Sequence, residues 1–230
     1  MMMYYDLHIH SCLSPCADDD MTPNNIINMS KLKGLDIVSI TDHNSTINLA
    51  AFCKVAEKNN IIFIPGVEVE TSEEIHILLY FRDRSVIGEF QKIIDENLPD
   101  LKVNEKVYGN QYVVDENDSI QNTYEKLLLQ PLNIDIVKLY EISMFYNMVF
   151  VPAHINRQSY GILGRLGGIP NEINQIKLVE VSSCGEIDIS PIKKTLSSCI
   201  FLHSSDAHSL GNINERVSYL DSEILYTIFF

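Results

Sequence analysis

The sequence predicts an α/β fold in which parallel strands close into a barrel. The first observation is the repeated order of short apolar run, turn and helical pattern along most of the 230 residues, which is typical of a parallel sheet covered by helices. The second is that six of the seven histidines lie in short motifs at the predicted carboxyl ends of strands. Side chains at that end of six or seven strands converge if the sheet closes. An open doubly wound sheet would bring fewer of them together, at one switch point.

The amino-terminal part of the chain supplies the clearest elements. The apolar run 4–10 predicts the first strand. Thr22 suits an N-cap, Pro23 suits the first helical turn, and Gly34 suits the end of that helix. The continuous β-branched run 36–40 is expected when both faces of a strand are buried. The next predicted elements are a helix over 44–58, a strand over 61–65, β structure over 66–71 and 75–81, and a helix over 85–97.

The regular pattern stops at residues 99–133, which are polar, rich in Asn, Asp and Glu, and weakly periodic. We interpret them as an insert, either short helices or a lid, in one domain that spans residues 1–230. The apolar end 224–230 is expected to dock on the barrel. The remaining predicted elements are a helix over 134–146, a strand over 148–153, a glycine-rich rim over 161–168, a strand over 177–182, a helix over 191–197, and strands over 199–204 and 216–220.

Bulk composition is that of an ordinary globular protein, with 46% hydrophobic and 21% charged residues. The net charge of −14 argues against nonspecific binding to nucleic acid or to anionic membranes. The five cysteines are scattered, and no signal-peptide pattern precedes them, so we expect reduced thiols in a cytoplasmic protein. Cys12 and Cys16 lack the second cysteine pair that a zinc knuckle needs, and are interpreted as loop or wall residues.

The histidine motifs predict a metal site. His8 and His10 are two residues apart in a predicted strand, so they face the same side and can bind one ion. Asp206 and His208 share that spacing. Histidine is the commonest protein ligand for metals, and a single H-x-H motif is weak evidence on its own. The prediction becomes strong, for more than one ion, when these pairs are joined by the other candidate ligands His43, Glu68, His76 and His154.

The ordered series of motifs resembles the polymerase and histidinol phosphatase (PHP) superfamily of metal-dependent phosphoesterases. The resemblance covers residues 4–220. It implies a distorted (β/α)7 TIM-like barrel with the metal site at the carboxyl ends of the strands, and up to three divalent ions chosen from zinc, manganese and iron. The motifs that carry it are Asp6-Leu7-His8-Ile9-His10, Thr41-Asp42-His43, Gly66-Val67-Glu68, His76, Pro152-Ala153-His154 and Ser205-Asp206-Ala207-His208.

The resemblance also implies three ligand sets, with Glu68 bridging the first two. These sets are His8, His10, Glu68 and Asp206; then Glu68, His76 and His154; then Asp18, His43 and His208. Asp18 is chosen because it lies five residues before Pro23, as the family's aspartate does, and Asp19 and Asp20 compete with it. Glu70 competes with Glu68 because both share one strand face.

Several other residues are candidates for supporting roles. Asp42 is interpreted as an acceptor that orients a ligand histidine, or else as a cap of the helix expected from residue 44. Glu180 interrupts an apolar strand, and could contact a substrate hydroxyl or a ligand, or form a structural ion pair. Arg157 and, second, Arg165 are candidates for binding phosphate, against the alternative of ordinary surface arginines. His203 is expected to be packed or hydrogen-bonded rather than a ligand.

Clustered divalent ions suit the hydrolysis of phosphate esters, because metals lower the pKa of bound water and stabilise charge on phosphate oxygens. The expected function is a metal-dependent phosphoric ester hydrolase that acts on a small phosphomonoester through a metal-activated hydroxide, with no side chain assigned as general acid. Three alternatives stay open. They are a phosphodiesterase or exonuclease acting on nucleotides or short oligonucleotides, a histidinol-phosphate phosphatase, and a non-catalytic metal-binding regulatory domain. No membrane partner is expected.

Overall fold

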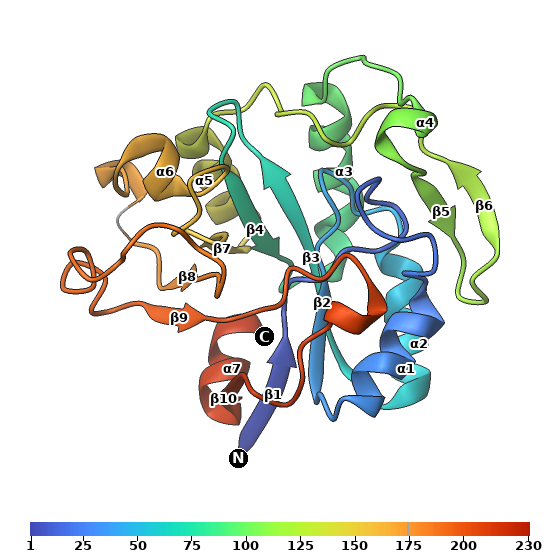
Figure 1. The fold of residues 1–230 in the computed structure, drawn as a ribbon, viewed down its shortest axis with the longest axis horizontal. Helices are drawn as coiled ribbons and strands as arrows, with labels where there is room; N and C mark the ends of the chain where they lie inside the picture. The colour runs from blue at the N-terminus through green and yellow to red at the C-terminus, as the bar shows by residue number, and fades with distance from the viewer. Residues whose placement is uncertain (174) are drawn as a thin grey trace.

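A curled six-stranded sheet lies at the centre of the computed structural model, which describes residues 1–173 and 175–230 (Figure 1). Together with the surrounding helices it makes a mixed α/β fold. The strand order is β10-β1-β2-β3-β4-β7. The strands are β1 (Met2–Asp6), β2 (Ile37–Ile40), β3 (Ile62–Glu70), β4 (His76–Tyr80), β7 (Val149–Pro152) and β10 (Tyr219–Asp221).

The expectation of a wholly parallel sheet is wrong at two strands. β1, β2 and β3 are parallel, but β4 runs antiparallel to both of its neighbours, and β10 runs antiparallel to β1. Only residues 71–75 join β3 to β4, and so short a connection allows a hairpin but no crossover helix. Since β7 reverses direction again, it runs parallel to β3, and its carboxyl end faces the same side of the sheet.

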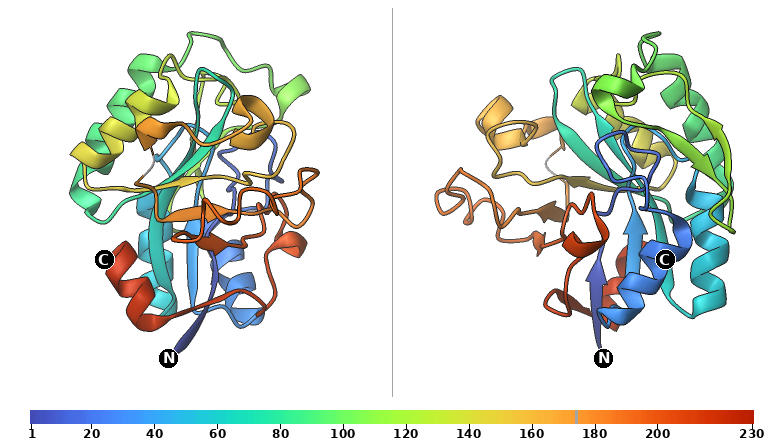
Figure 2. Two further views of the ribbon diagram at one scale, coloured as in Figure 1. Left: turned by 90° about the vertical axis from the view of Figure 1, so that its left-hand side faces the viewer. Right: turned by 45° about the vertical axis from the view of Figure 1, so that its right-hand side comes forward.

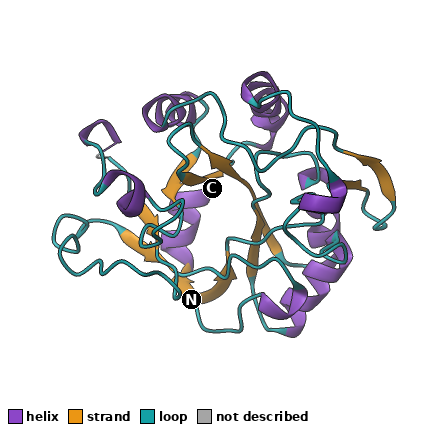
Figure 3. Ribbon diagram, turned by 45° about the horizontal axis from the view of Figure 1, so that its top comes forward, coloured by secondary structure: helices purple, strands orange, loops and turns teal. Residues whose placement is uncertain are grey.

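Two further strands continue the curl beyond β7. β8 (Leu178–Glu180) and β9 (Ile200–Leu202) are parallel to each other. The Ile155 N–H donates to the Glu180 carbonyl at 2.9 Å, which joins the end of β7 to β8. On the far side, the His10 N–H donates to the Ala207 carbonyl at 2.9 Å. The two sheets therefore follow one another around a common axis, with helices on the outside (Figure 3).

The helices match the predicted pattern in most places. α1 and α2 pack side by side on one flank of the sheet, and β8 and β9 lie on another (Figure 2). The longer helices are α1 (Pro23–Leu32), α2 (Leu49–Asn59), α3 (Ile87–Asn97), α5 (Ile136–Phe145) and α7 (Ser222–Phe229). Short helical segments are η1 (Arg84–Val86), α4 (Glu105–Tyr108), α6 (Ile162–Leu166), η2 (Asn171–Ile173) and η3 (Leu210–Asn212).

Local contacts correct the predicted bounds at three places. The first strand ends at Asp6 rather than residue 10, and Ile9 makes only an isolated bridge to Ala207. α2 begins at Leu49 rather than residue 44, because Asn44 has a left-handed backbone (φ 44°) and its amide donates to two carbonyls of the insert. The helix predicted over 191–197 is a series of turns, since only Leu196 of that segment is buried to hold it against the core.

One apolar cluster fills the interior of the curl. It takes alternate residues from strands of both sheets, as expected when every second side chain points inward. α7 closes its lower end (Figure 1): Leu225 and Phe229 are buried, and the Phe229 ring packs edge-on against Tyr80 at 5.3 Å between centroids. The predicted docking of the apolar carboxyl end is thus confirmed. The inward residues from the strands include Tyr5, Ile37, Ile64, Leu78, Tyr80, Val151, Leu178 and Leu202.

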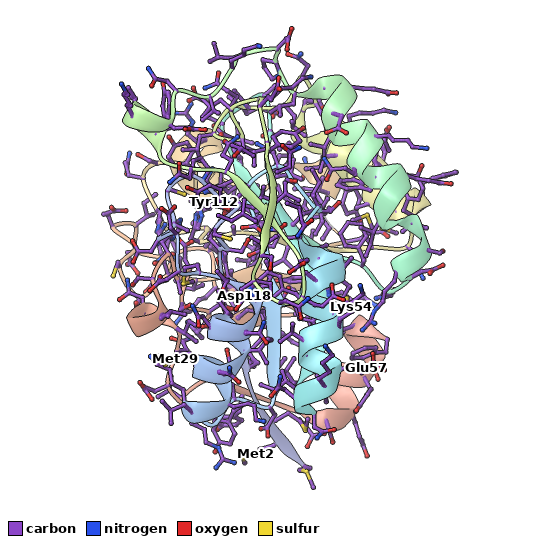
Figure 4. The ribbon with its side chains drawn as sticks, turned by 90° about the vertical axis from the view of Figure 1, so that its right-hand side faces the viewer. Met2, Met29, Lys54, Glu57, Tyr112 and Asp118 are labelled. Atoms are coloured by element: carbon purple, nitrogen blue, oxygen red, sulfur yellow. The ribbon has the colours of Figure 1, made fainter. Side chains whose placement is uncertain are left out.

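The predicted insert contains a small structure of its own. Besides α4, it holds the hairpin β5 (Tyr112–Val114) and β6 (Ile120–Thr123), which runs along α2 beside Lys54 (Figure 4). The Asn48 amide donates to the Tyr112 carbonyl and accepts the Val114 N–H, both at 3.0 Å. The Tyr112 N–H also donates to the Cys12 carbonyl at 2.8 Å. The insert is therefore anchored to the loop that follows His10.

None of the helices in the described part of the chain is both long enough and apolar enough to cross a bilayer.

Removal of the Phe229 ring should destabilise the fold. We expect Phe229→Ala to lower the free energy of unfolding by about 3–5 kcal/mol, because the ring is fully buried beneath Tyr80 and its loss leaves a cavity. Phe230→Ala is the matched control: its ring is 57% exposed, and its loss should change stability by less than about 0.5 kcal/mol. Urea denaturation of the metal-free variants measures both. Equal effects would show that α7 does not close the core.

Candidate metal centre

The buried carboxylate of Glu68 is the centre of the site. Glu68 lies in β3 and is fully buried. The loop after β2 fixes its backbone, since the Glu68 N–H donates to the Asp42 carbonyl and the Asn44 N–H donates to the Glu68 carbonyl. Its two oxygens lie 2.9–3.3 Å from a nitrogen of each of five histidines, His8, His10, His43, His76 and His154.

Three ligand atoms beside Glu68 have the mutual spacing of ligands in a tetrahedral metal site. The His8 Nε2 and His10 Nε2 atoms are 3.2 Å apart, and Asp206 Oδ1 lies 3.3 and 3.2 Å from them. His8 Nε2 is 3.3 Å from Glu68 Oε1, and His10 Nε2 is 3.3 Å from Glu68 Oε2. Ligands bound at roughly 2.0–2.1 Å to a tetrahedral ion are about 3.3–3.4 Å apart. The cage thus fits a divalent ion.

Two more groups of histidines flank this cage. On one side the His10 ring stacks on His208 at 4.2 Å and lies 4.4 Å from His43, and these three can offer nitrogens to one ion. On the other side the rings of His76 and His154 are 5.3 Å apart, each within reach of Glu68 Oε1. The buried Glu68 Oε2 atom lies 3.3 Å from His10 Nε2 and 3.1 Å from His43 Nδ1, but no well-directed hydrogen bond reaches it from the described residues. A buried anionic oxygen without such a donor suits a cation.

The electrostatics of the site follow from burial and from paired charges. Burial alone would raise the pKa of Glu68, but the charges of His76, His8 and His43 lower it well below its usual range. Burial opposes a charge on His10, yet its contacts with Asp206 and Glu68 raise its pKa to about 9. The pKa of His8 is also raised, against the effect of burial, by Glu180, Glu68 and Asp206.

The pKa values of His43 and His208 shift in the opposite direction. Burial, followed by the charge on His10, lowers the pKa of His208 to about 4. The same two causes hold the pKa of His43 well below its usual range. These two rings are therefore neutral at pH 7, which is the state that binds metal.

Asp42 supports the ligands through serines. Its buried carboxylate accepts the Ser11 N–H at 2.7 Å, the Ser11 hydroxyl at 2.6 Å and the Ser14 hydroxyl at 2.7 Å. The Ser14 oxygen in turn lies 3.0 Å from His10 Nδ1 and accepts the His43 N–H at 3.1 Å. Asp42 thus acts on His10 indirectly. Ser14 was not predicted from the sequence, where its one distinguishing feature is its place four residues after His10.

Glu180 is a direct partner of two ligand candidates. Its oxygens lie 3.1 and 3.0 Å from His8 Nδ1, and Oε2 accepts the His154 N–H at 2.9 Å. A carboxylate on Nδ1 turns Nε2 of the imidazole toward the metal and fixes the tautomer. Of the roles considered for Glu180, the contact with a ligand is the one that this geometry supports.

The competing acids separate clearly. Glu70 is 4.0 Å from His76 and touches no other histidine among the described residues, whereas Glu68 lies at the centre. Asp18 is exposed; its N–H donates to the His208 carbonyl at 2.8 Å, but in the described region its carboxylate makes no hydrogen bond or ion pair with His43 or His208. The Asp19 carboxylate accepts the Asn110 amide at 2.9–3.0 Å, facing the insert.

The predicted cations lie in different places. Arg157 reaches the site: its Nη1 donates to Asp206 Oδ2 at 2.7 Å, and its side chain is 33% exposed. Arg165 pairs with Glu74 and donates to the Glu73 carbonyl, away from the ligand cage. His203 is outside the cluster and is exposed rather than packed; its Nδ1 lies 3.2 Å from the Val181 carbonyl, which agrees with the hydrogen-bonded alternative.

A family model described as the PHP domain matches residues 6–144, which is more than half of the chain. The chain belongs to the PHP domain family. The resemblance inferred from the motifs is thereby confirmed, and the matched region includes the candidate ligands from His8 to His76.

Individual relatives agree with this family. The 3′,5′-nucleoside bisphosphate phosphatase of Chromobacterium violaceum is 34% identical over 80 residues, which are 34% of this chain and 27% of that protein. Crystal structures show the same fold. A protein from Bifidobacterium adolescentis, provisionally described as a metal-dependent phosphoesterase, has a TM-score of 0.66 at 15% identity over 97% of this chain and 94% of its own.

The lesion-specific endonuclease PfuEndoQ from Pyrococcus furiosus has a TM-score of 0.65 at 24% identity, over 91% of this chain and 49% of that chain. This chain therefore spans about a quarter of the bisphosphate phosphatase in the matched region and about half of the endonuclease. The likeness to these solved structures shows the fold.

Metal binding by this PHP domain should release protons at neutral pH. A raised pKa means that protonated His10 stabilises the metal-free fold below about pH 6.5, and that this contribution is lost as the pH rises through about 9. A metal must displace that proton, so calorimetry of Zn²⁺ binding in buffers of different ionisation enthalpy should show at least about one proton released per chain at pH 7, and fewer at pH 10. Release of the same number of protons at pH 7 and at pH 10 would contradict a protonated His10 in the metal-free protein.

Neutralising Glu180 should weaken metal binding without removing a ligand. We expect Glu180→Gln to reduce Zn²⁺ affinity about 10–100-fold, because the amide no longer stabilises and orients His8 as the carboxylate does. Glu96→Gln, at an exposed position of α3, is the control and should leave affinity unchanged. A competition titration with a chromogenic chelator measures both. An unaltered affinity for Glu180→Gln would mean that the packing of β8 alone holds His8.

Proposed function

We propose that this PHP domain is a metal-dependent phosphoesterase that hydrolyses a small phosphomonoester. The observation that carries the proposal is the cage of His8, His10, Asp206 and Glu68, whose spacing fits a divalent ion, with further histidines on both sides. Bound divalent ions would supply a hydroxide at neutral pH and positive charge for the phosphate oxygens. The family and the phosphatase relative support this class of reaction.

Three divalent ions, of zinc, manganese or iron, are the proposed complement. The cage would hold one ion, and Glu68, His76 and His154 would hold a second. The third would use His43 and His208, which the geometry groups with His10, and Asp18 as the proposed carboxylate ligand. Asp18 is the weakest member of this set because only its backbone contacts His208.

The chain's own side chains provide the rest of the proposed mechanism. Arg157 already donates one hydrogen bond to Asp206, and its partly exposed guanidinium has further N–H groups that can donate to phosphate oxygens. An arginine in that position would place the phosphate against the cage and offset its charge. Glu180 and Asp42 would hold the orientation of the ligand histidine rings during hydrolysis, Glu180 by direct contact with His8 and Asp42 through Ser14. No side chain is assigned as general acid.

The proposed architecture is one domain over residues 1–230 whose curled sheet and β8–β9 together form a distorted (β/α)7 barrel. The inner apolar cluster, shared by strands of both sheets, supports closure. Backbone hydrogen bonds on both sides of β8–β9 also support closure: one side bonds to the end of β7, and the other to the segment from His8 to His10.

A nucleotide substrate is the second candidate. The phosphatase relative is named for nucleoside bisphosphates, and the structural neighbour is a DNA endonuclease. The net charge of −14 disfavours a long polymer but allows a mononucleotide or a short oligonucleotide.

The test is phosphate release by manganese-loaded protein from a panel of phosphomonoesters that includes AMP, ribose 5-phosphate, histidinol phosphate and a short 5′-phosphorylated oligonucleotide. We expect release from a small phosphomonoester, and a loss of at least about 100-fold in kcat/KM for Asp206→Asn, which removes a cage ligand and the partner of Arg157.

Asp100→Asn, at an exposed position outside the site, is the matched control and should retain full activity. Bound metal is measured in each sample. Metal-loaded wild-type protein that releases no phosphate from any compound would contradict the phosphomonoesterase and favour a regulatory metal-binding domain. Release that survives Asp206→Asn would point to a contaminating enzyme.

A further inference from the structure

Tyr160 presents an exposed aromatic ring next to the ligand cluster. Its ring stacks on His76, with centroids 4.5 Å apart and planes 21° from parallel. His76 in turn lies 2.9 Å from Glu68, so Tyr160 is separated from the central carboxylate by a single imidazole. Tyr160 is nevertheless 45% exposed, and among the described residues His76 is its only aromatic neighbour. One face of the ring is thus packed while much of the side chain remains available to a ligand.

The backbone holds this ring in a fixed position. The Tyr160 carbonyl accepts the His76 N–H at 3.0 Å, and this hydrogen bond joins the backbone of Tyr160 to the first residue of β4. The backbone of Tyr160 is left-handed, with φ 61°, a conformation that an aromatic residue adopts only when its surroundings impose it. At Gly161 an added Cβ would lie 2.4 Å from the Arg157 carbonyl oxygen, so the turn is too tight for a side chain there.

The same short loop connects the ring to the candidate metal and phosphate contacts. It begins at His154, which reaches Glu68, and passes Arg157, which binds Asp206, before it arrives at Tyr160. The Arg157 N–H donates to the His154 carbonyl at 2.9 Å, so these residues form one compact turn after β7. A phosphate held at Arg157 and the cage would leave the rest of its molecule at the rim that Tyr160 occupies.

We propose that Tyr160 is a stacking platform for the base of a nucleotide, and that it makes the enzyme prefer nucleoside phosphates to sugar phosphates without a base. This inference rests on the proposed phosphoesterase function and names its substrate class. Every nucleobase has a flat π face, and stacking on a fixed aromatic ring binds bases with little sequence preference. The ring is already stacked on His76, so the cost of ordering it when the substrate binds is reduced.

The experiment compares AMP with ribose 5-phosphate, two phosphomonoesters that differ by the base. We expect Tyr160→Ala to lower kcat/KM for AMP about 5- to 150-fold, mainly through KM, and to change that for ribose 5-phosphate less than about twofold. Tyr160→Phe, which keeps the ring, should retain the preference for AMP. Tyr226→Ala, on α7 at the opposite end of the strands, is the control for loss of an exposed tyrosine.

Two readouts separate the platform from other roles of the ring. An equal loss for both substrates, with reduced metal content, would overturn the proposal and make Tyr160 a positioning residue for His76. Calorimetric binding of AMP, which needs no turnover, gives the second readout. If the wild type binds AMP in a ring-dependent way but hydrolyses nothing, the platform stands and the phosphoesterase proposal fails. If Tyr160→Ala binds and cleaves AMP as well as the wild type does, the platform is wrong.

Discussion

The buried charge of Glu68 is the constraint on which the other features of the site depend. A carboxylate without solvent costs several kcal/mol unless cations or donors surround it. Here five histidines meet that requirement, from four different segments of the chain, and each segment is held by contacts of its own. The insert bonds to the loop after His10, Asn44 fixes the loop after β2, and Glu180 holds both His8 and His154. The site is therefore a property of the whole chain rather than of one motif.

The apolar interior explains why the polar cluster lies only at one end of the curl. α7 and the inward side chains fill the other end, so the region beneath the ligands is apolar and each paired charge acts in a low-dielectric surrounding. The pKa values of the histidine rings therefore shift in opposite directions. His10, between Glu68 and Asp206, gains a proton, whereas His43 and His208, which face the charge on His10, lose theirs. A cation bound between His8 and His10 would take the place of their protons, and its own charge would keep His43 and His208 neutral.

Most candidate ligands could be predicted from the sequence because they lie in short motifs near the carboxyl ends of strands, and these ends converge in a curled sheet. His76 is at the amino end of β4, and it reaches the same edge of the sheet because β4 is reversed. The structure brings His8, His10, His43, His76, His154, Glu68, Asp206 and His208 together as expected. Contacts between distant segments could not be predicted in the same way. Ser14 looks like any loop serine until Asp42 and His10 are placed on either side of it. The reversal of β4 could have been predicted, since five residues cannot make a crossover.

The architecture separates the proposed chemistry from the proposed specificity. Strand ends carry most of the ligands, where the sheet restricts their movement, while the loop from His154 to Gly161 carries one ligand, one cation and one exposed ring. A change at Tyr160 can alter which molecule is bound without displacing Glu68, because the His76 ring stands between Tyr160 and the carboxylate. His154 is the exception: it belongs to both parts, and Glu180 holds its backbone. Substitutions that shift the start of the loop should therefore affect metal binding and specificity together, whereas those near its end should affect specificity alone.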